Sequence, residues 1–363
     1  MARFASMLAV AVRALRRRWL RSWPGVVLLS CVGGTFGLAN AQAAPSGGKA
    51  WEPSVEPRER SVSEWLLRIR QASRVPSYVG TFVVSSDNGA MSSARIWHVR
   101  QGDVELERVE ALTGSPRAVF RRNDVVVTFL PQSHTFKTER PNMDTGKGAS
   151  KPLDADIFGL TADFYTARQI GQDRVAGVAT DIVQLSPRDS LRFGYRIWSE
   201  KRTGLAIKTE TLDRSGRVLE QAAFSELRLD APVKASTLQR MMGDTGGYKA
   251  EASPRVLSSA EAEGWRMKSE IPGFKPQNCY RHATVMTGQM VQWIFSDGLA
   301  AVSVFVEPFQ PERHVREGVA VMGATHALTR RLTAGEAQWW VTVMGEAPAS
   351  TLGAFVDNLE RRP

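Results

Sequence analysis

Apolar and polar residues alternate most regularly between Tyr195 and Phe224. Three alternating runs in this stretch are separated by residues 199–204 and 213–216, which are rich in the Gly, Asp and Ser typical of tight turns. Neighbouring residues on a strand point to opposite faces of a sheet. The pattern therefore predicts an antiparallel meander of three strands.

The same alternation gives the predicted meander one apolar face. Its apolar side chains are Leu191, Phe193, Tyr195, Ile197, Leu205 and Ile207. Most antiparallel sheets with one face on a core and one in water show this pattern. A curved sheet whose apolar hollow holds a lipid or a partner segment would show it too. On that second interpretation the candidate lipid-binding residues are Phe193, Tyr195, Ile197, Leu205 and Ile207.

Arginines recur on the other face of the predicted strands. Arg188, Arg192 and Arg196 are spaced four residues apart. The planar guanidinium group suits two-pronged binding of phosphate or carboxylate, so these three residues are candidates for binding an anionic ligand. A solvated strand face whose basic residues discourage edge pairing would have the same composition.

The N-terminus has the features of a secretory signal peptide. It carries six arginines and no acid, then an apolar stretch from Pro24 to Ala39, then the small-x-small sequence 41–43. This order predicts a signal peptide over residues 1–43, cleaved after Ala43, and a periplasmic mature protein. An uncleaved anchor is disfavoured because the apolar stretch is short and rich in glycine.

Removal of the signal peptide changes what charge and cysteine content imply. Six arginines leave with it, so the formal net charge falls from +10 to +4, and nucleic acid is not an expected partner. Cys31 leaves too, so Cys279 is alone and no intrachain disulfide can form.

Periodicity divides the rest of the chain into two predicted domains. Residues 44–60 predict a flexible leader, and 61–227 a large antiparallel sheet that begins with one amphipathic helix. Residues 228–256 lose periodicity and are predicted as a linker. Residues 257–363 predict a smaller α+β domain, with a hairpin turn at 296–298 and a last helix capped by Ser350. The fold class is α+β.

The sequence contains no recognisable catalytic or metal-binding motif. Its five histidines show neither the spacing of zinc ligands nor a neighbouring cysteine, and no nucleophile elbow or phosphate-binding loop is present. We therefore expect a binding protein rather than an enzyme, with no cofactor and no metal. An exported hydrolase with dispersed carboxylates stays an alternative, and the sequence leaves homo-oligomer formation open.

Particular blocks of residues resemble the RseB/MucB family, exported regulators of the sigma-E envelope-stress pathway. In the first predicted domain these are Gly171, Arg174-Val175-Ala176-Gly177, Pro187-Arg188-Asp189, Arg192, Gly194-Tyr195-Arg196, Trp198, Thr203-Gly204-Leu205, Leu212-Asp213, Gly216 and Val218-Leu219-Glu220-Gln221. In the second they are residues 271–274, 295–305 and 341–346. The resemblance runs from about Ser61 to the C-terminus.

The resemblance implies a fold, a function and partners. The fold would be a half-barrel sheet similar to lipoprotein carriers, followed by a smaller α+β domain. The function would be negative regulation: the protein binds the periplasmic part of a membrane-spanning anti-sigma factor and shields it from proteolysis. Lipopolysaccharide or an acyl lipid would release that partner. A periplasmic lipid or lipoprotein carrier is the alternative, using the same sheet without an anti-sigma partner.

Overall fold

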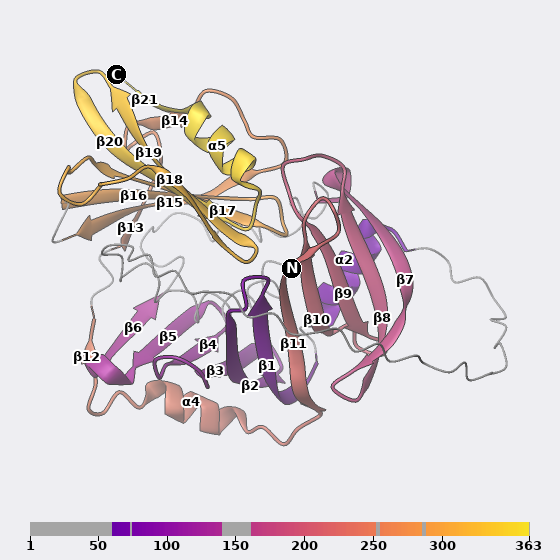
Figure 1. Ribbon diagram of the computed structural model, residues 1–363. Helices are drawn as coiled ribbons and strands as arrows, with labels where there is room; N and C mark the ends of the chain where they lie inside the picture. Colours follow the sequence, from indigo (N-terminus) through magenta and orange to yellow (C-terminus); the bar gives the residue numbers. More distant parts are fainter. Residues whose placement is uncertain (1–59, 73–74, 140–160, 252–254, 285–287, 363) are drawn as a thin grey trace, which may run out of the picture.

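The computed structural model describes residues 60–72, 75–139, 161–251, 255–284 and 288–362 (Figure 1). The predicted signal peptide, and all but the last residue of the predicted leader, lie outside these ranges. Within the described ranges no helix is both long and apolar enough to span a membrane.

Two β-sheets dominate the molecule. The larger has twelve strands in the spatial order β12 (Lys249–Ala250), β6 (Thr135–Glu139), β5 (Val125–Leu130), β4 (Ala118–Arg122), β3 (Val104–Ala111), β2 (Met91–Gln101), β1 (Ser77–Ser86), β11 (Val218–Leu229), β10 (Ala206–Leu212), β9 (Gly194–Glu200), β8 (Val178–Pro187) and β7 (Tyr165–Val175). All neighbours are antiparallel except β12 and β6. The chain meanders outward from β1 to β6, resumes at the far edge with β7, and meanders back until β11 pairs with β1.

Helix α2 (Val62–Gln71) packs on one face of this sheet. A capping box starts it: the Ser61 backbone N–H donates to the Glu64 carboxylate at 2.8 Å, and the Glu64 N–H donates to the Ser61 hydroxyl at 3.2 Å. Trp65, Leu66 and Ile69 of α2 are buried in one core with residues from nine neighbouring strands of the sheet, from β4 across β1 to β7 in the spatial order above. Nine strands can share the core of so short a helix only if the sheet curves around it.

Helix α4 (Ala235–Gly243) covers the opposite face, along β2 to β4 (Figure 1). Leu238 is buried against Val99 and Leu106, while Met241 and Met242 pack near Phe129. The segment predicted as a linker, 228–256, therefore contains helix α4, which packs on the larger sheet, and strand β12, which is part of that sheet. A nine-residue helix with few apolar positions, and with Ser236 and Gly243 inside its two ends, gives little periodicity to read.

The smaller sheet has seven strands. Their order is β13 (Arg255–Ser258), β15 (Lys275–Thr284), β16 (Gly288–Ser296), β17 (Ala301–Pro308), β20 (Ala337–Gly345), β19 (Thr325–Ala334) and β18 (Gly318–Met322). Helix α5 (Ala349–Asn358) packs on β19 and β20, and β14 (Trp265–Met267) pairs with β21 (Leu359–Arg361). The predicted hairpin at 296–298 is confirmed as the β16–β17 turn. The cap predicted at Ser350 is wrong, because Pro348 is the N-cap residue and Ser350 lies inside the helix.

The predicted fold class, a large antiparallel sheet with few helices followed by a smaller sheet domain, is confirmed. Figure 1 shows the smaller sheet lying across one end of the strands of the larger one. The contacts between the two sheets form the first part of the candidate site.

Candidate functional site

Arg192 ties the two sheets together. It lies just before β9, and its side chain is fully buried. Its Nη1 is 3.2 Å from the Asp297 carboxylate in the β16–β17 turn, and its Nε is 3.0 Å from the Asp189 carboxylate. Nη2 donates to the Pro272 carbonyl at 2.6 Å. One guanidinium group thus bonds to its own loop and to two segments of the smaller sheet domain.

The space around this guanidinium group is tightly filled. The Arg192 Cζ atom lies 4.4 Å from the ring centroid of Phe164 and 5.1 Å from that of Phe274, within range of cation–π attraction. Gly273 passes beside it with φ +79°, and a Cβ there would lie 2.7 Å from Nη1. Glycine is required at 273 both for the backbone conformation and for this close approach.

Asp297 is the main partner of Arg192 in the smaller domain. Its Oδ1 accepts the N–H groups of Leu299 and Ala300 at 2.9 and 2.7 Å, and its Oδ2 accepts the Tyr165 hydroxyl at 3.1 Å. The Asp297 carbonyl accepts the Thr161 hydroxyl at 2.9 Å. Burial raises the pKa of Asp297 above its ordinary value, although Arg192 opposes the shift. The carboxylate is buried, but it has hydrogen-bond partners from both sheets.

A second contact lies beside the first. The two-residue turn between β18 and β19 rests on the larger sheet, where Ala324 is buried with Phe193 and Leu219. The Phe193 and His326 rings meet edge to face, with centroids 5.4 Å apart. The Thr351 hydroxyl at the start of α5 donates to the Leu191 carbonyl at 2.8 Å. Residues 191–193 therefore contact the smaller domain at three consecutive positions, and we call this set of contacts the joint.

The candidate lipid-binding residues do not form one surface. Tyr195, Ile197, Leu205 and Ile207 are buried in the core beneath α2, whereas Phe193 is in the joint. The predicted apolar strand face includes Phe193, but Phe193 lies outside the strand, because β9 begins at Gly194. Lipid binding by the other four residues stays a prediction, and α2 covers them in this arrangement.

The three candidate arginines have three different surroundings. Arg188 is exposed, Arg192 is in the joint, and Arg196 is half-buried with its Nη1 2.8 Å from the Glu210 carboxylate on β10. They do not form the open row that their spacing predicts. Anion binding by Arg188 or Arg196 stays a prediction, while Arg192 already has two carboxylate partners.

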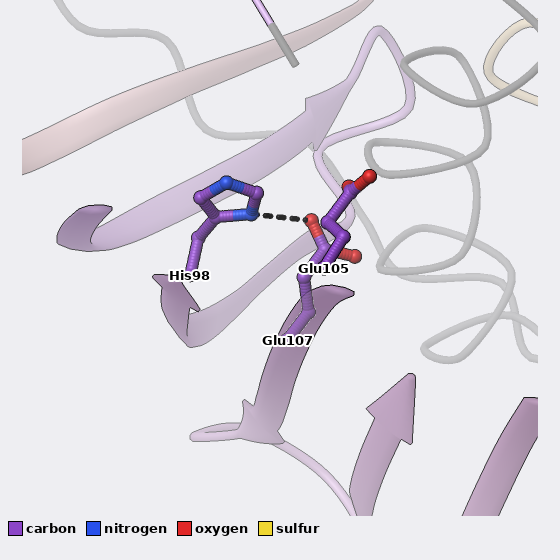
Figure 2. Close-up of side chains that lie close together, drawn as sticks. All are labelled: His98, Glu105 and Glu107. Atoms are coloured by element: carbon purple, nitrogen blue, oxygen red, sulfur yellow. Dashed lines mark hydrogen bonds and ion pairs between the residues drawn. The ribbon is translucent and has the colours of Figure 1, made fainter. Parts of the chain in front are cut away.

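A buried charged cluster lies elsewhere in the larger sheet, on β2, β3 and β4. It consists of His98, Glu105, Glu107 and Arg121, and Figure 2 shows His98 pointing at Glu107 from the neighbouring strand. Burial alone would raise the pKa of Glu107, but Arg121 and then His98 outweigh it and lower that pKa.

This cluster resembles a metal site in its ligand types but not in its charges. One ligand atom from each of His98, Glu105 and Glu107 lies within 4.8 Å of the others. However, the Arg121 guanidinium group lies 2.7 Å from Glu105 and 2.6 Å from Glu107, so a cation already bridges both carboxylates. His98 has acceptors at both ring nitrogens, Glu107 at 3.1 Å and the Val75 carbonyl at 3.2 Å. These residues do not fit a metal ion, and the cluster is a buried ionic network.

Sequence reasoning missed the joint and the charged cluster for the same reason. Arg192 and Asp297 are far apart in the chain, and His98 meets Glu107 only through the β2–β3 register. The available signals were weaker: Asp297 in a strong hairpin turn, and two glutamates on one face of a short strand.

The sequence comparison decides the family. Residues 61–242 match the MucB/RseB N-terminal domain, and residues 259–360 match the MucB/RseB C-terminal domain. The chain belongs to the MucB/RseB family. The relatives are named as regulatory proteins, and MucB has been solved in complex with MucA, so the expectation of a regulatory binding protein rather than an enzyme is confirmed.

Relatives match along most of their length. The sigma factor AlgU regulatory protein MucB of Pseudomonas aeruginosa is 29% identical over 303 residues, which cover 80% of this chain and 87% of the relative. The sigma-E factor regulatory protein RseB of Escherichia coli is 22% identical over 334 residues, which cover 89% of this chain and 93% of the relative.

Solved structures of MucB agree in fold. The complex structure of P. aeruginosa MucA/MucB aligns with a TM-score of 0.65 at 26% identity, covering 83% of this chain and 99% of that chain. A crystal structure of MucB in complex with MucA(peri) aligns with a TM-score of 0.63, and a crystal structure of MucB with a TM-score of 0.56. Both are 26% identical and cover 83% of this chain.

Proposed function

We propose that this chain is an exported, periplasmic negative regulator of a sigma-E type response. It binds the periplasmic part of a membrane-spanning anti-sigma factor and shields it from proteolysis. The observation that carries the proposal is the match to both domains of the family in the right order, together with MucB structures solved as complexes with MucA.

The joint supplies a place where binding can be regulated. The chain aligns better with the two MucA-bound structures than with MucB alone, although identity is equal and coverage of this chain is the same. This difference supports an overall domain arrangement closer to that of the MucA-bound structures. A releasing ligand shifts the equilibrium only by its differential affinity for the two arrangements. We therefore propose that release involves opening the contacts at residues 191–193.

Lipopolysaccharide or an acyl lipid is the proposed signal, and the apolar face under α2 is its proposed site. To expose Ile197, Leu205 and Ile207, α2 must leave, which uncovers three large side chains at roughly 1.5–3 kcal/mol each. An acyl chain of about twelve methylenes gains about 10 kcal/mol on burial, at about 0.8 kcal/mol for each, and this gain would have to offset the exposure of Trp65, Leu66 and Ile69 on α2.

The test of partner binding uses the mature chain from Ala44 and the periplasmic segment of a MucA-type anti-sigma factor. Micromolar or tighter binding by calorimetry, with slower cleavage of the segment by an added protease, is the expected result. No binding at micromolar concentration would reject the regulator.

The test of the signal adds lipopolysaccharide or short-chain anionic lipid to the preformed complex. Release of the segment is expected, and Arg188→Glu should weaken it while Arg202→Glu, also exposed, should not. Lipid binding without any partner binding would favour the carrier function instead.

A further inference from the structure

Strand β18 is an open edge of the smaller sheet. It pairs with β19 on one side, and among the described strands none pairs with it on the other. Its residues Val319 and Val321 are 53% and 54% exposed, and Val315 just before it is 83% exposed. Natural proteins protect edge strands with charge, proline or a covering segment, and the described residues of β18 show none of these on the strand itself. An apolar edge of this kind is typical of a docking site for another strand.

The register shows which backbone groups of β18 face outward. Met322 pairs with Thr325 across a two-residue turn, so residues 318, 320 and 322 exchange hydrogen bonds with β19. The alternate residues, Val319 and Val321, then point their N–H and C=O groups toward the open edge. The two residues with exposed apolar side chains are also the two with backbone groups available for pairing.

The side chains of these valines point toward the core face of the sheet. Val319 lies opposite Leu328, which is buried in the second core, and paired residues on neighbouring strands share a face. A strand added beside β18 would therefore extend this core by one row. Its apolar side chains would meet Val319 and Val321, and its backbone would bond to theirs.

Charge argues for a partner chain rather than a second copy. Between residues 316 and 334 the β18–β19 ribbon carries three arginines, Arg316, Arg330 and Arg331, against one acid, Glu317; Asp357 of α5 pairs with Arg330, which leaves Arg316 and Arg331 in excess over Glu317. A second copy would bring the same excess of positive charge to the shared edge, because a symmetric interface pairs the same surface on both subunits. An acidic partner segment would be attracted.

Position also favours a partner whose binding depends on the joint. The turn that ends β18 is part of the joint, where Ala324 packs on Phe193. A strand bound along β18 would run directly up to the contact between the two sheets.

We propose that β18 binds an extended segment of the anti-sigma factor by adding it as an eighth strand. The segment has apolar side chains at alternate positions and acidic residues flanking them. This inference rests on the proposed function and names the surface that performs it. Pairing to an edge strand uses main-chain bonds for affinity and alternate side chains for selectivity.

The experiment measures binding of the mature chain to the periplasmic segment of a MucA-type anti-sigma factor. The variant Val319→Lys with Val321→Lys should bind about tenfold or more weakly, because two apolar contacts at the centre of the interface become charges. The matched control is Val256→Lys, since Val256 is 49% exposed on β13, the opposite edge of the same sheet, and its affinity should not change.

Amide hydrogen exchange gives a second, independent measurement on the wild-type chain. The amides of 319 and 321 should exchange fast in the free protein and become protected in the complex. Those of 320 and 322 should be protected in both states, because they already bond to β19.

Each other outcome has a distinct meaning. If the segment binds, but the lysine variant binds equally well and the amides of 319 and 321 stay unprotected, the edge-strand proposal is wrong and the regulator function stands. If the wild-type chain does not bind the segment, both fail. Protection of these amides in the free monomer would show that the protein's own chain covers β18. Protection that appears only with dimer formation would show that a second copy does, and either result overturns the proposal.

Discussion

Replacing Arg192 with methionine removes the charge at the joint while keeping an unbranched side chain. Asp297 would then be a buried carboxylate without its ion-pair partner. Removing one partner of a buried ion pair destabilises proteins by about 3–5 kcal/mol. Asp297 keeps the Tyr165 hydroxyl and two backbone N–H groups, so we expect the lower end, about 3 kcal/mol. This is more than a hundredfold change in the equilibrium between docked and separated sheets.

Two measurements report the loss. Urea denaturation gives the free energy of unfolding, and energy transfer between dyes gives the separation of the sheets. Cysteines introduced at Met91 and Val315, which are 71% and 83% exposed, would carry the dyes. Burial raises the pKa of the native Cys279 thiol to about 12, so that thiol stays protonated and should not compete for label.

The chain provides a matched control. Arg202 and Asp230 are also 3.2 Å apart, but their side chains are 67% and 59% exposed. Arg202→Met should therefore change stability by less than about 1 kcal/mol. Equal losses in the two variants, or unchanged energy transfer in Arg192→Met, would refute the reasoning that burial makes the Arg192–Asp297 pair the main tie of the joint.

Three further predictions concern the joint and the charged cluster. The folded-state pKa of Glu107 lies below its ordinary value of 4.5, so the stability it contributes is present above that value and is lost as pH falls through the folded pKa. Urea midpoints between pH 6 and 3 should therefore decline less in Glu107→Gln than in wild type, and parallel declines would contradict this. Gly273→Ala should cost about 1–3 kcal/mol more than Gly89→Ala, because both glycines have positive φ but only position 273 lacks room for a Cβ. A denaturant titration that ranks the two variants equally would count against a close-packed Arg192. Zinc or a chelator should leave the melting temperature unchanged, because Arg121 already supplies the positive charge in the cluster, and a rise of several degrees with zinc would show that the cluster binds metal.

Sequence patterns predicted the features that depend on neighbours in the chain. Alternation located the β8–β11 region, the capping box at Ser61 located the start of α2, and the 296–298 turn located the β16–β17 hairpin. In each case the residues that determine the element lie within a few positions of one another. The family resemblance extended this to the order of the two domains.

What alternation could not predict is what covers each face. The apolar face at Tyr195 and Ile197 fitted either a core face or a lipid-holding hollow, and nothing in a strand's own sequence identifies α2 as the helix that packs on it. Arg192 was predicted on a cationic face. Its partner Asp297 lies in the other domain, so strand alternation could not show that the two residues pair. Both outcomes depend on tertiary contacts.

The central position of β1 has a consequence for how the molecule is made. Tyr78, at the start of β1, pairs with Leu229, at the end of β11. The first strand of the sheet therefore has no partner on this side until β11, far along the chain, has formed. In the export proposed above, the emerging N-terminal half would cross the membrane with that strand unpaired on one side. Such distant pairings slow folding and leave apolar surface open to aggregation. The newly translocated chain is therefore expected to depend on periplasmic chaperones until residue 229 has been delivered.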